Sequence, residues 1–236
     1  MSDASKPPAP LDPVRGVFLG DLAHDLSAPL TAIHGAIELI LSGAYGPLDG
    51  EQRAMVVEVL ASAREMRAIV QDVADLGALD GGRLVFGAAR VDVAAMVDEL
   101  GASMGELARR RGVSFSLDAS NARTPIESDD RRLRQVLTCV LGYVTKATRR
   151  GSRIAATVSQ EDGQLRVEVR ATGITPSGDP QSLFADRRDS APGVPKPYRG
   201  PGLGLPLVGR VVQAWGGRTH AELVDGTLVI KVDVPV

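Results

Sequence analysis

Three residues near the N-terminus have the types and spacing that phosphoryl chemistry requires. His24 is followed directly by Asp25, and Pro29 lies five residues after the histidine, inside a helical pattern of apolar residues. A neutral imidazole beside a carboxylate that orients or deprotonates it is a competent nucleophile toward a phosphoryl group. Proline removes one backbone hydrogen bond and bends or loosens a helix locally. His24 is therefore a candidate nucleophile.

Helix geometry separates this histidine from the apolar face of its own helix. Apolar residues recur at alternating spacings of three and four, which predicts a helix over residues 17–41 that packs as in a coiled coil. At about 100° per residue, His24 lies roughly 200° from Leu22 and Leu26 and points away from that face. His34 lies at the edge of the face and is expected to be a packing residue. Most exposed histidines are merely solvated, so exposure alone assigns no role.

A second amphipathic helix is predicted between Val56 and Val73, after a glycine-rich turn at residues 42–50. Two such helices joined by a short loop form an antiparallel hairpin. A lone hairpin cannot bury both apolar faces, whereas pairing with a second copy in a four-helix bundle would bury them. We therefore expect a homodimer, with packing of the hairpin onto the rest of its own chain as the alternative.

The pattern changes near residue 90, where strands begin to alternate with helices. The predicted strands are a short one near residue 91, then 113–117, 154–158 and 165–169, and two more within 219–234. The predicted helices are one that follows the first strand and ends at residue 104, then 129–148 and 202–215. Mixed strands with helices on one side indicate an α+β sandwich. The long stretch 176–201, rich in proline, glycine and charge, predicts a mobile lid. The predicted domains are a disordered leader (1–13), the hairpin (14–82) and the sandwich (90–236).

Composition excludes several other classes of protein. The net charge of −2 gives no electrostatic footprint for nucleic acid and no polybasic membrane patch. The single cysteine, Cys139, cannot form an intramolecular disulfide and excludes a cysteine-cluster metal site, which fits a reducing cytoplasm. No apolar run reaches the roughly 18 to 20 residues of a membrane helix, so no membrane insertion is expected. The leader does not resemble a signal peptide, and with no sensor domain before the first helix the input is expected from an upstream sensor protein.

Residues 18–33, with the sequence FLGDLAHDLSAPLTAI, resemble the phosphoacceptor box of sensor histidine kinases. The resemblance implies that His24 is the phosphoacceptor, that Asp25 is its catalytic neighbour, and that the partner is the receiver domain of a response regulator. In that family the fourth residue after the histidine is usually Thr or Asn, which positions water for dephosphorylation of the response regulator. Ala28 stands there and cannot bind water through its side chain, so phosphatase activity of the usual kind is not expected.

The C-terminal part resembles the ATP-binding domain of the same kinases and of the gyrase and chaperone ATPases. Gly200, Gly202 and Gly204 match the glycine motif that follows the lid, where backbone amides approach phosphates at a helix N-terminus. Gly173 matches a glycine of the family's strand-end motif. Lys146 is retained in the helix that holds magnesium and phosphates in the family, and it either pairs with an anion or is a solvated surface lysine.

Three positions depart from that ATP-binding pattern. Cys139 and Tyr143 stand where the family has asparagines, and neither supplies the amide or carboxylate oxygen that magnesium prefers. Ala171 stands where the family has the aspartate that accepts a hydrogen bond from the adenine amino group, which removes the main source of adenine specificity. Thr175 stands at or next to the position of the motif's second glycine. Together these departures predict a degenerate nucleotide site.

The resulting hypothesis is a pseudokinase of two-component signalling that acts through His24 as a histidine phosphotransfer or response-regulator-binding protein. No cofactor and no resident metal are expected, and ATP with magnesium would bind only if the nucleotide site still works. One alternative is an active ATP-dependent sensor histidine kinase with a divergent site. Another is a regulatory adaptor in which His24 is inert.

Overall fold

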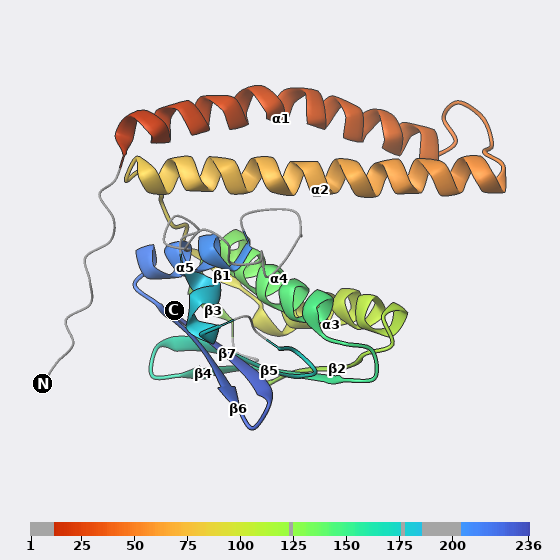
Figure 1. The fold of residues 1–236 in the computed structure, drawn as a ribbon. Helices are drawn as coiled ribbons and strands as arrows, with labels where there is room; N and C mark the ends of the chain where they lie inside the picture. Colours follow the sequence, from red (N-terminus) through yellow and green to blue (C-terminus); the bar gives the residue numbers. More distant parts are fainter. Residues whose placement is uncertain (1–11, 123–124, 176–177, 186–203) are drawn as a thin grey trace, which may run out of the picture. The chain divides into compact units, whose positions relative to one another are not determined.

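The computed structural model describes residues 12–122, 125–175, 178–185 and 204–236 (Figure 1). The chain divides into two compact units, Met1–Leu84 and Val85–Val236. The predicted leader, except for its last two residues, lies outside the described residues, as does most of the predicted lid.

The first unit is a hairpin of two long helices, α1 (Pro13–Leu41) and α2 (Gly50–Asp80), as the apolar spacing predicts (Figure 1). The side chain of Asp12 caps α1 by accepting a hydrogen bond from the backbone N–H of Arg15. Asp49 and Gln52 form a reciprocal capping box at the start of α2. Both caps satisfy backbone donors that have no partner within the helix, and they fix where each helix begins.

The two helices touch backbone to backbone near one end of the hairpin. A side-chain carbon added at Gly16 would lie 2.6 Å from the backbone nitrogen of Gly81 and 2.7 Å from the carbonyl oxygen of Gly77. Such distances leave no room for any side chain at Gly16. Arg15 adds an ion pair with the buried carboxylate of Asp80, at 3.5 Å. Glycine is therefore required at this crossing because of the close approach of the helices.

Much of the apolar surface of the hairpin remains exposed within one chain. Leu30 and Ile37 of α1 are buried against α2, together with Leu60 and Val70. Val14 of α1 is 82% exposed, and eleven further large apolar residues are between 39% and 67% exposed: Val17, Phe18, Leu22, Leu26, Ile33 and Leu39 of α1, and Met55, Val57, Val59, Met66 and Ile69 of α2. The single hairpin thus buries only part of its apolar surface.

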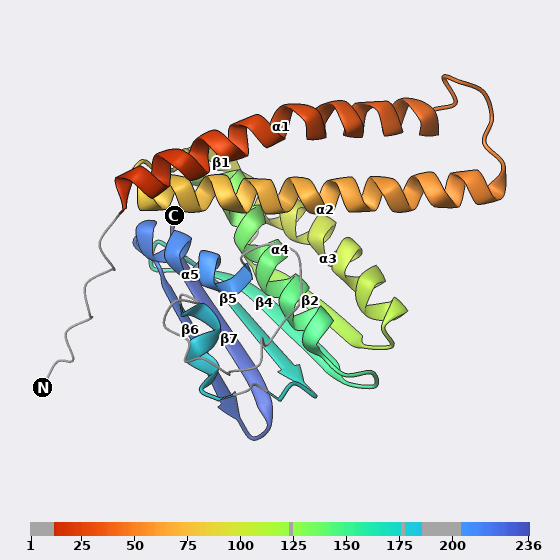
Figure 2. The ribbon, with the colours of Figure 1, turned by 45° about the horizontal axis from the view of Figure 1, so that its top comes forward.

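The second unit contains a five-stranded sheet covered by helices on one face (Figure 2). The elements, in chain order, are β1 (Ala89–Val91), α3 (Val93–Arg110), β2 (Ser114–Asn121), β3 (Ile126–Ser128), α4 (Asp130–Ala147), β4 (Arg153–Glu161), β5 (Gln164–Thr172), η1 (Pro180–Phe184), α5 (Gly204–Ala214), β6 (Arg218–Val224) and β7 (Thr227–Pro235). The sheet order is β2-β4-β5-β7-β6, and only the β2–β4 pair is parallel. The predicted sandwich is confirmed.

Strand β5 shows how the core is built. Every second residue is buried, namely Leu165, Val167, Val169 and Ala171, and these side chains belong to the same apolar cluster as those of the helices. Period-two alternation places them on the face that the helices cover, while the residues between them face away. The two tight turns at Asp162-Gly163 and Asp225-Gly226 both have positive φ angles, as hairpin turns of this type require.

Two short elements were not predicted from the sequence. Strand β3 pairs with β1 in a separate two-stranded sheet. The 3₁₀ helix η1 lies inside the stretch predicted as a lid, and its Gln181 side chain bonds the N–H of Ala221 (2.8 Å) and the carbonyl of Thr219 (3.3 Å). Gln181 therefore covers part of the free edge of β6. Within the described ranges, none of the helices is long and apolar enough to cross a membrane.

Replacing Gly16 with alanine is expected to destabilise the hairpin, because the new methyl group would collide with the backbone of α2. Overpacking of this kind costs about 1–3 kcal/mol. Gly35→Ala is the matched control on the same helix: nothing lies within 4 Å of its added carbon, and alanine should stabilise the helix by about 0.5–1 kcal/mol. Urea unfolding followed by circular dichroism compares the two variants, and a Gly16→Ala midpoint at or above that of the wild type would refute the close contact.

Candidate functional site

His24 is presented to solvent by α1. Its side chain is 89% exposed and that of Asp25 is 81% exposed, whereas the side chain of His34 is only 17% exposed and contacts Glu38. The Nδ1 atom of His24 lies 3.4 Å from a carboxylate oxygen of Asp25, which is long for a hydrogen bond but close enough to favour a proton on that nitrogen. In this tautomer Nε2 carries the free lone pair and faces away from Asp25.

The helix continues through Pro29, one turn beyond this histidine. Proline has no N–H, so the carbonyl of Asp25 lacks its usual intrahelical donor. Two hydroxyls bond carbonyls on the same stretch: Ser27 Oγ donates to the carbonyl of Ala23 at 2.7 Å, and Thr31 Oγ1 donates to that of Ser27 at 2.8 Å. The turn that carries His24 is thus held by side-chain bonds as well as by the backbone.

The second group of predicted site residues depends on α4, which is fixed at its N-terminus by Asp129. The carboxylate of Asp129 accepts hydrogen bonds from the backbone N–H of Gly87 at 2.7 Å and of Arg132 at 2.9 Å. Burial alone would raise the pKa of this carboxyl, but the two donors, with help from Arg131, outweigh it and the pKa lies below its ordinary value. Asp129 is therefore ionised at neutral pH and suits the positive end of the helix.

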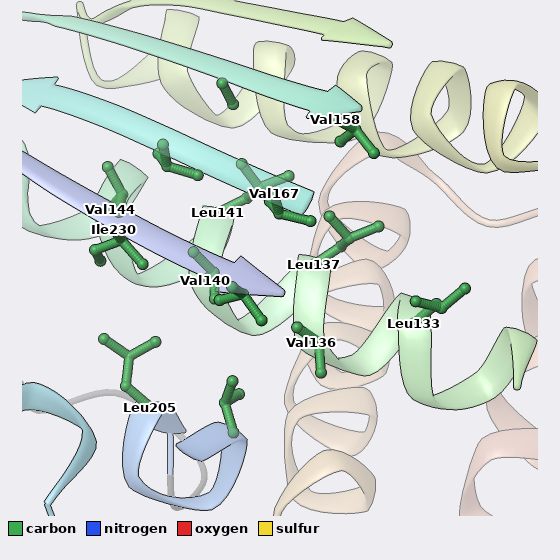
Figure 3. Packing of buried hydrophobic residues seen from close by; sticks show 14 of the residues in the cluster. Leu133, Val136, Leu137, Val140, Leu141, Val144, Val158, Val167, Leu205 and Ile230 are labelled. Carbon is green, nitrogen blue, oxygen red and sulfur yellow. The ribbon is translucent and has the colours of Figure 1, made fainter. Parts of the chain in front are cut away.

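One face of α4 packs into the core of the domain. Figure 3 shows its buried side chains beside those of Val158, Val167 and Ile230 from the sheet. Cys139 and Tyr143 are half-buried and pack against the same cluster. Burial raises the pKa of the Tyr143 phenol. The two positions predicted to correspond to family asparagines therefore carry a thiol and an aromatic ring in contact with apolar groups.

Ala171 lies near the end of β5, the central strand of the sheet. It pairs with Ile154 on β4 and with Leu228 on β7, and it is only 1% exposed. Its methyl group is part of the apolar core. An ionised carboxylate at such a position would need compensating hydrogen bonds, and alanine supplies no polar group that could bind adenine.

Gly173 follows β5 with a φ of +71°, a conformation that favours glycine. A side-chain carbon there would collide with the hydroxyl of Ser152. The close approach of this turn to the α4–β4 connection explains the glycine without any ligand. Gly173 therefore has a structural role whether or not a nucleotide binds.

Two of the remaining predicted residues, Lys146 and Gly204, lie at the end of α4 and at the start of α5. Gly204 begins α5 with a φ of +62°, whereas Gly200 and Gly202 lie outside the described residues. Lys146 is half-buried in the last turn of α4, where its backbone carbonyl accepts a hydrogen bond from Arg111. Cys139, Tyr143 and Ala171 thus contact one core cluster, while His24 belongs to the other unit.

One contact of this unit was missed at the sequence level. Phe86 stacks on Trp215, the single tryptophan, with ring centroids 5.1 Å apart and an interplanar angle of 12°. Beside it, Gly87 is bound by Asp129. The segment that follows the hairpin is therefore attached to the sandwich at two points. Nothing in the spacing of the sequence predicts a pairing over such a separation.

Known proteins resemble both units. The family model of the His Kinase A (phospho-acceptor) domain matches residues 14–82, and that of the histidine kinase-, DNA gyrase B-, and HSP90-like ATPase matches residues 128–236. Similar proteins include the circadian input-output histidine kinase CikA of Synechococcus elongatus, 27% identical over 90% of this chain, and the signal transduction histidine-protein kinase BarA of Escherichia coli K12, 27% identical over 86%. The chain covers only 28% and 22% of the lengths of these relatives.

A crystal structure of full-length ShkA in complex with AMPPNP is similar across 93% of this chain and 46% of its own, with a TM-score of 0.66 and 25% identity. The order of the two domains and the arrangement of helices and strands agree with these matches. The chain belongs to the histidine kinase family and contains the phospho-acceptor and ATPase-type domains of a sensor histidine kinase catalytic core.

Proposed function

We propose that this chain is a pseudokinase that acts as a histidine phosphotransfer protein in the cytoplasm. His24 exchanges a phosphoryl group with an aspartate on the receiver domain of a response regulator, and ATP is not required. Residues 14–82 serve as the dimerisation and phosphoacceptor domain, and residues 90–236 as a structural or protein-binding module.

One contrast carries the proposal. The nucleophile is open to solvent, with His24 89% exposed, whereas the position of the adenine anchor is closed, with Ala171 1% exposed. In the transfer, Nε2 of His24 attacks phosphorus, and the new N–P bond forms as the bond to the aspartate oxygen breaks. The proton stays on Nδ1, where the carboxylate of Asp25 stabilises the positive charge that develops on the ring.

The groups at the former nucleotide site do not fit magnesium and ATP. Magnesium prefers oxygen ligands in tight octahedral geometry, but the side chain at position 139 is a thiol and that at position 143 is a half-buried phenol in contact with the core. Ala171 cannot accept the hydrogen bond of the adenine amino group. The proposed transfer therefore uses no ATP.

The exposed apolar side chains of α1 and α2 support the homodimer. Side chains such as Leu22, Leu26 and Ile33 are 41%, 42% and 47% exposed in the single chain, and a second hairpin would cover them. Burial of apolar area contributes about 25 cal/mol per Å². His24 lies on the other side of the helix, so pairing through this surface leaves it free for a receiver domain.

A second candidate is an ATP-dependent kinase. It is favoured by the similarity to ShkA, which was crystallised with AMPPNP, and by the presence of Lys146 and Gly204 at the expected ends of α4 and α5. The third candidate is an adaptor with an inert His24. It would bind the same partner, but His24 would not accept a phosphoryl group.

The half-buried phenol of Tyr143 is expected to ionise at a higher pH than an exposed tyrosine, whose pKa is about 10, because burial disfavours the charged form. Because the pKa of Tyr143 is higher in the folded than in the unfolded state, its protonated phenol contributes to the stability of the fold. This contribution is complete below the unfolded-state pKa and is lost as the pH rises through the folded-state pKa. A titration followed by absorbance at 295 nm should show a tyrosine ionisation phase at high pH. This phase should be absent from Tyr143→Phe and present in the control Tyr45→Phe. A high-pH phase that remains in Tyr143→Phe would show that the raised pKa does not belong to Tyr143.

Phosphotransfer is tested with receiver domains labelled by radioactive acetyl phosphate. Incubation of the full chain with a labelled receiver panel should move label onto the wild type in an acid-labile, base-stable form, as expected for phosphohistidine. His24→Ala should reduce this label to background, because the attacking nitrogen is removed. His220→Ala is the control, since His220 is also exposed but lies on β6.

Label on His24→Ala equal to that on the wild type would refute His24 as the acceptor. If no receiver labels the wild type and Mg-ATP does, the ATP-dependent kinase replaces the proposal. If neither source labels the chain, the adaptor remains.

A further inference from the structure

Basic side chains gather where α3 and α4 end. Figure 2 shows these helices side by side, each leading into a strand at the same end of the unit. The N–H of Gly151 bonds the carbonyl of Gly112 at 2.8 Å, and a side-chain carbon added at Gly112 would lie 2.9 Å from Arg150 Cγ. The ends of α3 and α4 and the loops that follow them therefore lie side by side, and we call the basic side chains of residues 106–112 and 145–153 the arginine surface.

The arginine surface is much more basic than the chain as a whole. Its two segments contain one acidic residue, Glu106, and seven basic ones: Arg109, Arg110, Arg111, Lys146, Arg149, Arg150 and Arg153. The net charge of the whole chain is −2, so the rest of the molecule is acidic. The overall charge balance therefore conceals a local concentration of basic residues, and an anionic surface would attract this part of the molecule.

Some of this charge has a role inside the fold. Glu106 pairs with Arg109 and with Nε of Arg110, the latter at 2.8 Å. Arg111 donates to the carbonyls of Thr145 at 3.1 Å and Lys146 at 2.7 Å, at the end of α4. Basic groups at helix C-termini bind the last carbonyls and match the negative end of the helix dipole.

Three arginines have no such role. Arg149, Arg150 and Arg153 are exposed, and their side chains form no ion pair with any residue that the structure describes. A planar guanidinium offers paired donors that match two phosphate oxygens, and arginine binds phosphate well for this reason. These three side chains are therefore available to an external anion.

We propose that the arginine surface docks the chain on a membrane through the phosphates of anionic phospholipid headgroups. The exposed large apolar side chains of the described residues all lie outside its two segments. A specific protein interface normally has an apolar or aromatic centre, and single-stranded nucleic acids stack on aromatic rings. A bilayer needs neither, because polybasic segments are held at its surface by charge alone.

This inference is independent of the proposed function, because it concerns residues remote in sequence from His24 and requires no phosphoryl transfer. It differs from the expectation that the chain has no polybasic membrane patch. That expectation came from the overall charge, whereas the surface arises from two segments that only the fold brings together.

Vesicle sedimentation tests the inference with the full chain. Vesicles of phosphatidylcholine and phosphatidylglycerol at three to one are compared with pure phosphatidylcholine, at low salt and at high salt. Each basic residue at such a surface contributes about fivefold to partition, so Arg149→Ser/Arg150→Ser/Arg153→Ser should partition about a hundredfold more weakly onto the anionic vesicles. Arg149→Lys/Arg150→Lys/Arg153→Lys keeps the charge and should still bind.

The matched control is Arg53→Ser/Arg64→Ser/Arg67→Ser, which removes the same charge from exposed positions of α2. It should bind anionic vesicles like the wild type, and high salt should release both. Equal loss in the two serine variants would overturn the inference, because bulk charge would then explain it. Failure of the wild type to bind anionic vesicles, or binding to duplex DNA without vesicle binding, would overturn it as well.

Discussion

The packing of α4 against the five-stranded sheet is the contact on which the C-terminal unit depends. Its buried face joins the helix to β5 and β7 in one apolar cluster, and Asp129 fixes its start while also binding the segment after the hairpin. Tyr143 and Ala171 belong to or touch this same cluster. In the proposed pseudokinase, these positions contribute to the apolar core and do not bind a nucleotide, so the domain would be stable without a ligand.

In the hairpin, by contrast, much of the apolar surface stays exposed within one chain. Its two helices are held by close glycine contacts at one end and by few buried side chains elsewhere, so much apolar surface is left for a second copy. His24 lies away from that surface and is almost fully exposed. Phosphotransfer between a histidine and an aspartate needs an accessible nucleophile and a docking face, and in the proposed function the hairpin supplies both. The proposed loss of ATP chemistry therefore leaves the acceptor intact.

Periodic patterns made most of the fold predictable. The spacing of apolar residues gave both long helices, and alternation gave β4 and β5, since burial of one face imposes those periods. Short elements were missed because β3 and η1 are stabilised by distant partners, as when Gln181 bonds the backbone of β6. The exposure of His24 followed from helix angles, and the candidate site followed from family resemblance. The Phe86–Trp215 stack and the arginine surface could not be foreseen, because each joins separate segments.

The most direct measurement is calorimetric titration of the full chain with Mg-AMPPNP. The packing of Cys139, Tyr143 and Ala171 predicts no binding in the micromolar range. Tyr143→Asn/Ala171→Asp is the comparison, because it returns an amide oxygen and a carboxylate and should recover weak binding. Micromolar affinity of the wild type would contradict the loss of the nucleotide site and would make the chain an ATP-binding kinase.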